Sequence, residues 1–137
     1  MGRILAIDFG RKRTGLAVTD PLRITANPLL TIETKDLINW LQDYFARESV
    51  DEVVIGHPTQ MNGQDSESMN YIRPFIGNFK KIFPTMPITM YDERFTSVLA
   101  HQAMIAGGMK KKARQDKATV DKIAACIILE GYMDSLR

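Results

Sequence analysis

The sequence predicts an α/β fold in which a mixed five-stranded sheet is flanked by helices. Three apolar segments with the character of strands follow one another at the start of the chain, separated only by short turns. Helical and strand-like patterns then alternate, and strands joined through helices pair in parallel by right-handed crossovers. The chain of 137 residues is predicted to form one domain, residues 1–137, because domains commonly contain about 100–200 residues.

The first three strands are predicted to form an antiparallel meander, since only a few residues separate them. They are expected at Arg3–Gly10 (with its closing turn), Thr14–Thr19 and Arg23–Ile32. The first is an apolar run that ends in a carboxylate and a glycine, a pattern typical of a buried central strand followed by a turn. Pro28 favours an edge position or a bulge for the third strand, because proline cannot donate a ladder hydrogen bond.

The rest of the chain alternates helices with two more strands. Apolar residues recur at helical spacing between Leu37 and Phe45, with Thr34 as the expected N-cap. Two strands are expected at Val50–Gly56 and Ile88–Glu93, and three more helices at Ser66–Phe83, Ser97–Ala106 and Thr119–Leu136. Pro74 and Gly77 disfavour the first of these three helices, since proline removes a backbone donor and glycine adds backbone entropy.

Composition sets broad limits on function. The hydrophobic and charged fractions, 45% and 25%, are those of an ordinary globular protein, and a net charge of +2 does not by itself indicate a nucleic-acid partner. The one cysteine, Cys126, excludes an internal disulfide and lies in an apolar run typical of a core residue. Neither an export segment nor an apolar run of about 18 residues is present, so we expect a cytoplasmic protein without a membrane partner.

Carboxylates stand beside apolar segments in three places. Asp8 ends the first strand, Asp92 and Glu93 end the fifth, and Asp121 lies near the start of the last helix. The C-terminal ends of parallel strands meet at one edge of a sheet, where we expect Asp8 to meet Asp92 or Glu93. Only one of these two can face the same way as Asp8, because neighbouring strand residues face opposite sides.

Two of the three acidic positions also have a simpler explanation. Asp8 alone is as well explained as a turn residue that accepts hydrogen bonds from nearby amides. Asp121 alone is better explained by the positive end of the helix dipole, a contribution of about 0.3–1 kcal/mol. Together the acids favour a metal site, because clustered carboxylates repel one another unless a cation neutralises them. Hard oxygen ligands suit Mg²⁺ or Mn²⁺, and such a site suits phosphodiester hydrolysis.

Basic residues adjoin the candidate acids in two segments, and nucleic acid is the partner that they favour. The segments contain Arg11, Lys12 and Arg13, and Lys110, Lys111, Lys112, Arg114 and Lys117. Both could line the edge that carries the acids and bind phosphates. The alternative is a pair of solvated charged loops. His57, after the fourth strand, lies near this edge but has no evident ligand partner, and we do not expect it to contact substrate.

Four motifs, in order and over essentially the whole chain, resemble those of the YqgF family. They are Asp-Phe-Gly-Arg-Lys-Arg-Thr-Gly at Asp8–Gly15, Val-Ile-Gly-His-Pro at Val54–Pro58, Asp-Glu-Arg-Phe-Thr-Ser at Asp92–Ser97 and Val-Asp-Lys-Ile-Ala-Ala at Val120–Ala125. The resemblance implies a ribonuclease H-like fold related to Holliday junction resolvases. It also implies a nuclease that matures the 5′ end of pre-16S ribosomal RNA.

The same resemblance implies roles for individual residues. Asp8, Glu93 and Asp121 match the expected catalytic, metal-binding set, and Arg94 matches an arginine that supports the second acid or the phosphate. A resolvase acting on four-way DNA and a module that binds structured nucleic acid without cutting it remain alternatives. A resolvase should dimerise to cut two strands symmetrically, so the oligomeric state, monomer or weak dimer, stays open.

Overall fold

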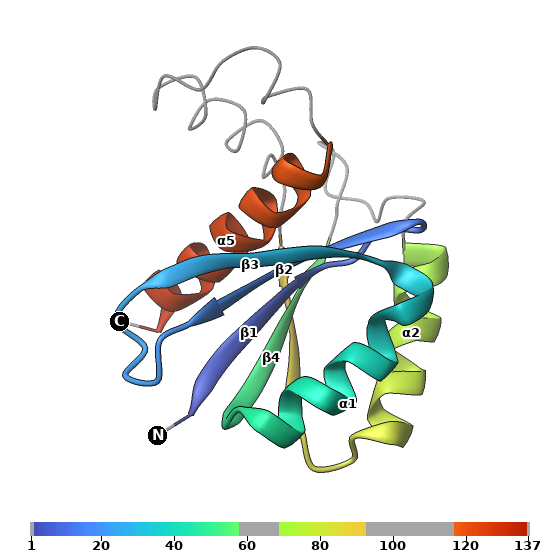
Figure 1. The fold of residues 1–137 in the computed structure, drawn as a ribbon, viewed down its shortest axis with the longest axis horizontal. Coiled ribbons are helices and arrows are strands. Elements are labelled where there is room, and N and C mark those ends of the chain that lie inside the picture. Colours follow the sequence, from blue (N-terminus) through green and yellow to red (C-terminus); the bar gives the residue numbers. More distant parts are fainter. Residues whose placement is uncertain (1, 58–68, 93–116, 137) are drawn as a thin grey trace.

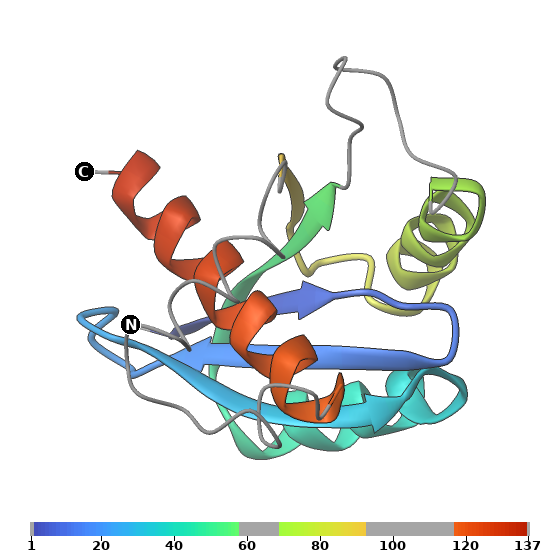
Figure 2. The same cartoon turned by 90° about the horizontal axis from the view of Figure 1, so that it is seen from above.

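The computed structural model describes residues 2–57, 69–92 and 117–136 (Figure 1). It contains one five-stranded sheet, with helices α1 (Leu37–Arg47) and α2 (Met69–Ile82) on one face and helix α5 (Lys117–Ser135) on the other (Figures 1 and 2). The predicted mixed sheet flanked by helices is therefore confirmed. No helix within the described ranges combines the length and the apolar character needed to cross a membrane.

The strands follow the predicted topology. Their bounds are β1 (Arg3–Asp8), β2 (Arg13–Thr19), β3 (Ala26–Glu33), β4 (Val50–His57) and β5 (Ile88–Asp92). Their order in the sheet is β3-β2-β1-β4-β5, with β1–β2 and β2–β3 antiparallel and β1–β4 and β4–β5 parallel. β3 is an edge strand whose register shifts opposite Leu16 and Ala17, beside Pro28, so both features suggested for this proline are present.

Three of the four predicted helices are present among the described residues. The described α2 begins at Met69 and tolerates Pro74, while apolar residues of the same helix, such as Phe79, are buried against the sheet. Packing of this apolar face outweighs the local cost of proline. The predicted helix at Ser97–Ala106 lies outside the described residues.

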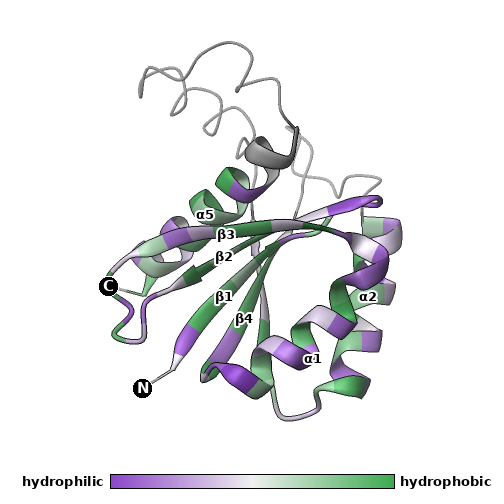
Figure 3. Ribbon diagram, viewed as in Figure 1, coloured by the Kyte–Doolittle hydropathy of each residue, from purple (hydrophilic) through white to green (hydrophobic). Residues whose placement is uncertain are grey.

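Side chains of β1 point alternately to the two faces of the sheet, so the strand contributes to both halves of the core. Leu5 and Ile7 belong to the cluster that α1 and α2 cover, whereas Ile4 and Ala6 belong to the cluster under α5. All four are at most 1% exposed, which identifies β1 as the central strand (Figure 3). Small residues on both surfaces, among them Ala17 of β2 and Ala125 of α5, let the helix lie close to the sheet.

The third strand begins later than predicted, because the preceding residues form a closed turn. The Asp20 carboxylate accepts hydrogen bonds from the backbone N–H groups of Ile24 (2.7 Å) and Thr25 (2.8 Å). These bonds, with that of Thr25 foremost, lower the pKa of Asp20. Arg23 adopts a left-handed conformation with φ 58°, which excludes it from the strand.

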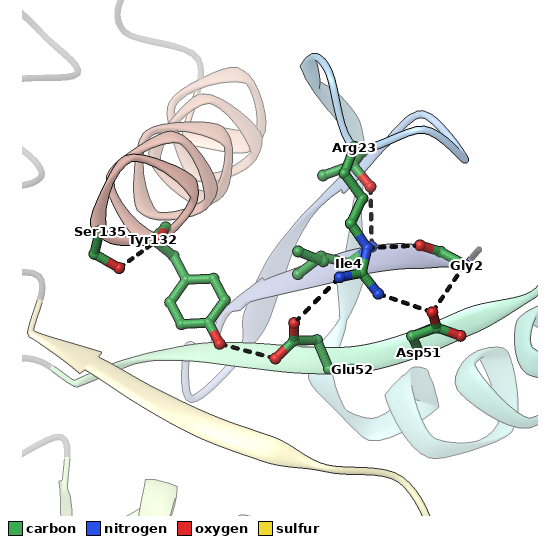
Figure 4. Close-up of polar contacts among 8 residues, drawn as sticks. Gly2, Ile4, Arg23, Asp51, Glu52, Tyr132 and Ser135 are labelled. Atoms are coloured by element: carbon green, nitrogen blue, oxygen red, sulfur yellow. Dashed lines mark hydrogen bonds and ion pairs between the residues drawn. The ribbon is translucent and has the colours of Figure 1, made fainter. Parts of the chain in front are cut away.

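The same arginine joins three segments at the end of the sheet where β1 and β4 begin, and Glu52 links them to α5 (Figure 4). Its guanidinium donates to the Gly2 carbonyl (2.9 Å) and to Asp51 (2.8 Å), and lies 3.9 Å from Glu52. Tyr132 of α5 donates its hydroxyl hydrogen bond to Glu52 at 2.8 Å, and burial raises the pKa of this phenol. The C-terminal half of α5 is thus fixed to β4 by a polar contact as well as by packing.

Thr34 does not cap helix α1 as predicted. It is the first residue of a short 3₁₀ helix, η1 (Thr34–Asp36), and no side chain caps either η1 or α1. Its hydroxyl instead donates to the carbonyl oxygen of Gly10 at 2.6 Å and lies 2.8 Å from the hydroxyl of Thr14. Its backbone N–H donates to the carbonyl oxygen of Lys12 at 2.9 Å. Thr34 therefore fastens the turn between β1 and β2.

This turn generates a stability prediction. A Cβ atom at Gly10 would overlap the backbone carbonyl oxygen of Arg13, and backbone cannot yield as a flexible side chain would. Gly10→Ala should therefore lower the free energy of unfolding by more than about 1 kcal/mol in urea titrations. Gly77→Ala is the matched control, because nothing lies within 4 Å of that position in α2. The control should raise stability by about 0.5–1 kcal/mol, and a destabilisation no larger at Gly10 than at Gly77 would contradict the model of the turn.

Candidate active site

Asp8 lies at the C-terminal end of the central strand, on the face that α5 covers. Its neighbours Ile7 and Phe9 both pack on the opposite face, where the ring of Phe9 stacks on that of Phe75 with centroids 4.4 Å apart. Alternation therefore places Asp8 on the side of Ile4 and Ala6. Asp8 is only half-buried, so its carboxylate avoids the large desolvation cost of a fully buried charge.

Glycines flank Asp8 in both adjacent strands. Gly15 of β2 is its antiparallel partner, and the parallel register of Ile7 with Ile55 brings Gly56 of β4 beside it on the other side. Both glycines share the α5 face, as shown by their neighbours two residues away, Ala17 and Val54. On this face neither neighbour of Asp8 carries a side chain. Glycine within a strand commonly marks a place where a ligand or another backbone approaches closely.

Sequence reasoning missed these two glycines as site residues. Each stands within a motif, but in the sequence one lies inside the second predicted strand and the other at the end of the fourth, with no sign that they meet. Only the register of three strands shows that both lie beside the same carboxylate. The detectable signal was their position within segments of strand character, where glycine is otherwise unfavourable.

The second acidic position lies at the end of β5. Tyr91 packs on the α5 face, where its ring makes an edge contact with Tyr132 at 6.3 Å and closely approaches Gly131. Asp92 is the last residue of the strand and pairs in register with His57. Glu93 and Arg94 lie outside the described residues. The structure thus places the end of β5 at the same edge as Asp8, separated from it by β4 alone.

The third acidic position, Asp121, lies in the first half of α5. It precedes the buried residues Ala124 and Ala125 by three and four positions, the spacing of one helical face. Its backbone is therefore on the stripe of α5 that faces the sheet. The part of the chain that the structure describes holds no group of three His, Cys, Asp or Glu side chains able to bind a metal. The structure does not describe the side chain of Asp121. Lys110, Lys111 and Lys112 lie outside the described residues.

The predicted basic turn forms part of a depression at this edge of the sheet. The depression, about 520 Å³ in volume, is lined by Arg11, Lys12, Arg13, Glu33 and Lys35. Figure 3 shows the turn between β1 and β2 as a hydrophilic tip next to the end of β3. Arg13 has Glu33 as its cross-strand partner, and Glu33 forms an ion pair with Lys35 at 3.3 Å. Thr34 holds the backbone of this turn in place, and the side chains of Arg11, Lys12 and Arg13 are exposed.

Cys126 is not a nucleophile in this arrangement. It lies in α5, half-buried against the second core cluster, with its Sγ 3.8 Å from Oε1 of Glu130. Burial, assisted by the charge of Glu130, raises the pKa of the thiol to about 11. The thiol stays protonated at neutral pH, and thiolate is the reactive form. The interpretation of Cys126 as a packing residue therefore holds.

The chain matches one protein family over nearly its whole length. The model of the RuvX family, described as "Holliday junction resolvase", matches residues 2–135. The chain belongs to the RuvX family. Its relatives include a protein of Phocaeicola vulgatus, 55% identical over 135 residues that cover 98% of this chain and 97% of the relative. A protein of Bacteroides thetaiotaomicron is 53% identical over 137 residues, 100% of this chain and 99% of that one.

Both relatives carry the name "Putative pre-16S rRNA nuclease". The resemblance drawn from the four motifs is thus confirmed, and so is the expectation of a nuclease family. Among solved structures, T. thermophilus RuvC in complex with a Holliday junction substrate is similar, with a TM-score of 0.57 and 16% identity. The similarity covers 97% of this chain and 96% of that one. It confirms the ribonuclease H-like fold.

The environment of Cys126 predicts slow alkylation. A pKa raised from 9.0 to about 11 leaves about a hundredfold less thiolate at pH 8 than an ordinary cysteine would have. Iodoacetamide should therefore modify the folded protein about a hundredfold more slowly than the urea-unfolded protein at this pH. The unfolded chain releases the thiol proton more readily, so this residue's contribution to stability should fall as the pH rises from about 9 to 11. Equal alkylation rates in the folded and unfolded states would contradict the assignment.

Proposed function

We propose that this RuvX-family chain is a divalent-metal-dependent nuclease, a single domain of residues 1–137 that hydrolyses phosphodiester bonds in structured nucleic acid. The observation that carries the proposal is the setting of Asp8. The carboxylate stands at the end of the central strand, on the α5 face, between two glycines that add no side chain beside it. Because the flanking glycines have no side chains, the backbone of a ligand can come close to Asp8. A phosphodiester chain is a ligand of this kind.

The proposed metal ligands are Asp8, Glu93 and Asp121, which are also the proposed catalytic residues. Glu93 is preferred to Asp92 because it matches the second acid of the family motif, and because Tyr91, the neighbour of Asp92 within β5, packs on the α5 face. The backbone of Asp121 lies on the sheet-facing stripe of α5, on the same side as Asp8. Carboxylates are hard oxygen ligands, the donor set that suits Mg²⁺ or Mn²⁺.

A bound divalent ion would supply an activated water and stabilise the charge on the leaving oxygen. The chain's own residues have other tasks in this proposal. Asp8 follows four buried residues of its strand, Ile4 to Ile7, and so provides a fixed ligand that does not need to reorganise. Gly15 and Gly56 admit the phosphodiester, and the basic residues hold the flanking phosphates.

The proposed phosphate-binding residues form three groups. They are Arg11, Lys12 and Arg13 in the β1–β2 turn, Arg94 beside the second acid, and the segment of Lys110, Lys111 and Lys112. The first group is supported by its place in the basic depression at the same edge as Asp8. The other two rest on the sequence, because they lie outside the described residues.

The proposed substrate is the 5′ end of pre-16S ribosomal RNA, as the names of the relatives suggest. The proposed setting is the cytoplasm, since one cysteine fits a reducing compartment. A four-way DNA junction is the second candidate, favoured by the description of the family. That reaction would call for a dimer. A non-catalytic binding module is the third, and it would need no metal-binding carboxylate.

Substitution of Asp8 separates these possibilities. Asp8→Asn keeps the shape of the side chain but removes its charge, so metal affinity should fall while the fold persists. Cleavage of a pre-16S RNA fragment in Mg²⁺ or Mn²⁺ should drop by more than about 100-fold, because loss of even an outer-shell partner costs about 10–100-fold. The midpoint of thermal unfolding should stay or rise, since carboxylate repulsion is relieved.

The matched control is Asp43→Asn, an exposed acid of α1 on the opposite side of the sheet. It should cleave as the wild type does. A side-by-side assay with a four-way DNA junction decides the substrate by the ratio of the two rates. Near wild-type cleavage by Asp8→Asn at saturating metal would rule out the proposed metal site, and no metal-dependent cleavage of either substrate would favour the binding module.

The basic segment at 110–112 generates a separate prediction. Neutralising Lys110, Lys111 and Lys112 together to glutamine should weaken binding to nucleic acids of different sequence by a similar factor, because lysines that contact phosphates read no bases. The slope of log affinity against log salt should flatten by at most about 0.9 per lost contact on duplex DNA. Titrations at several salt concentrations measure both quantities. An unchanged slope and affinity would contradict phosphate binding by these lysines and favour the interpretation of the segment as a solvated loop.

A further inference from the structure

The basic depression contains a lysine that none of the four family motifs includes. Lys35 belongs to η1, which follows β3, and it lines the depression together with the residues of the β1–β2 turn. Its side chain is 78% exposed, so its ammonium group is available to a ligand in solvent. The depression therefore combines cations from two segments of the chain that are more than twenty residues apart.

Charge in the depression is unequally balanced. Four of the lining residues are basic and one, Glu33, is acidic, which leaves a formal excess of three positive charges. Glu33 lies between the two segments, because it pairs in register with Arg13 and forms an ion pair with Lys35. Its carboxylate pairs with Lys35, and the lining as a whole keeps its excess of positive charge. An anion with several charged oxygens, such as a phosphodiester, fits this arrangement.

The shape of the depression is fixed by Thr34. The hydroxyl and the backbone N–H of this residue bind the carbonyl oxygens of Gly10 and Lys12, at 2.6 and 2.9 Å. The Thr14 hydroxyl, which is fully buried, completes the network at 2.8 Å. A flexible charged loop would lose conformational entropy on binding a ligand, whereas a turn held in this way has already lost it.

The depression continues the surface on which Asp8 lies. Arg13 and Gly15 are two residues apart in β2 and therefore share a face, and Gly15 is the direct partner of Asp8. Two residues of a strand span about 6.6 Å. A nucleic-acid backbone seated at Asp8 can thus reach Arg13 directly, and beyond it the ion pair that Glu33 makes with Lys35.

We infer that Lys35 is a further phosphate-binding residue and that Thr34 is a positioning residue that holds the β1–β2 turn for the same strand. The inference rests on the proposed function, because it takes a nucleic-acid backbone as the ligand. It adds a requirement on the substrate: the chain must continue past the scissile bond, over the β1–β2 turn, as far as η1. Substrates that end at the cleavage site lose these contacts.

Binding measured without cleavage tests the inference. In the Asp8→Asn background, Lys35→Gln is compared with Lys81→Gln. Lys81 is an exposed lysine in the last turn of α2, which leads to the start of β5 and so to the end of the sheet away from Asp8. The probes are an RNA hairpin with a single-stranded extension and a four-way DNA junction, each titrated at several salt concentrations. Lys35→Gln should weaken binding by about two- to fivefold, the range of a solvent-exposed ion pair. It should also flatten the salt slope by up to about 0.9 on duplex DNA and about 0.7 on a single strand.

Thr34 is tested by Thr34→Val and Thr34→Ser. Valine removes the hydroxyl at nearly constant shape, so binding should weaken while the salt slope stays the same, because no cation is lost. Serine keeps the hydroxyl and should restore wild-type affinity. A thermal melt of each variant shows that the protein is folded at the temperature of the titration. A purely structural role would lower the melting midpoint of Thr34→Val and leave affinity of the folded protein unchanged.

The outcomes separate this inference from the proposed function. Equal affinity and slope for Lys35→Gln and Lys81→Gln would overturn the role of Lys35, even if Asp8→Asn abolishes cleavage. Dependence of binding on Lys35, together with no metal-dependent cleavage of pre-16S RNA or of the four-way junction by the protein with Asp8 intact, would support the binding surface and reject the nuclease. Loss of affinity confined to one probe identifies RNA or four-way DNA as the ligand whose backbone crosses η1.

Discussion

The packing of α5 against the α5-facing residues of β1 is the contact on which the candidate site depends. Ile4 and Ala6 lie under this helix, and the same alternation that buries them presents Asp8 on the same side one step later. Alanines on both surfaces let α5 approach β1 closely. The helix that carries Asp121 in its first half therefore packs across the strand that ends in Asp8. A larger side chain at Ala6 or Ala125 would push α5 away from β1 and so increase the distance between the two acidic positions, without contacting either acid.

The far end of the sheet supports this packing. Tyr132 binds Glu52 of β4, and Arg23 joins Glu52 to Asp51 and to the Gly2 carbonyl (Figure 4). With its C-terminal half fixed there, α5 has a defined direction across the sheet, which sets where its N-terminal half lies. The left-handed backbone of Arg23 is consistent with this role, since a conformation of this kind persists only where surrounding contacts enforce it. The contacts at the end of the sheet where β1 and β4 begin thus help to set the position of α5 near Asp8, at the opposite end of β1.

The sequence was sufficient for the sheet and its order because apolar runs, short turns and helical spacing are local signals. It also placed Asp8 and Asp121 beside packed elements. Thr34 was assigned wrongly because an N-cap and a tether to a distant carbonyl use the same hydroxyl, and only the fold decides between them. The glycines beside Asp8 and the contribution of Lys35 to the depression depend on strand register and on long-range proximity, which no window of sequence contains. The assignment of Glu93, which lies outside the described residues, stays a prediction.

The central claim is that a divalent ion binds on the α5 face at the end of β1. Titration of the isotope-labelled protein with Mn²⁺, with Mg²⁺ as the diamagnetic reference, tests it most directly, because Mn²⁺ broadens the amide signals of nearby residues. The account predicts broadening first at the end of β1, at Gly15 and Gly56, and in the first turns of α5, with the turn at Asp20–Thr25 unaffected. Broadening that begins among the acids at the C-terminal end of α5, or on the α1 and α2 face, would contradict it.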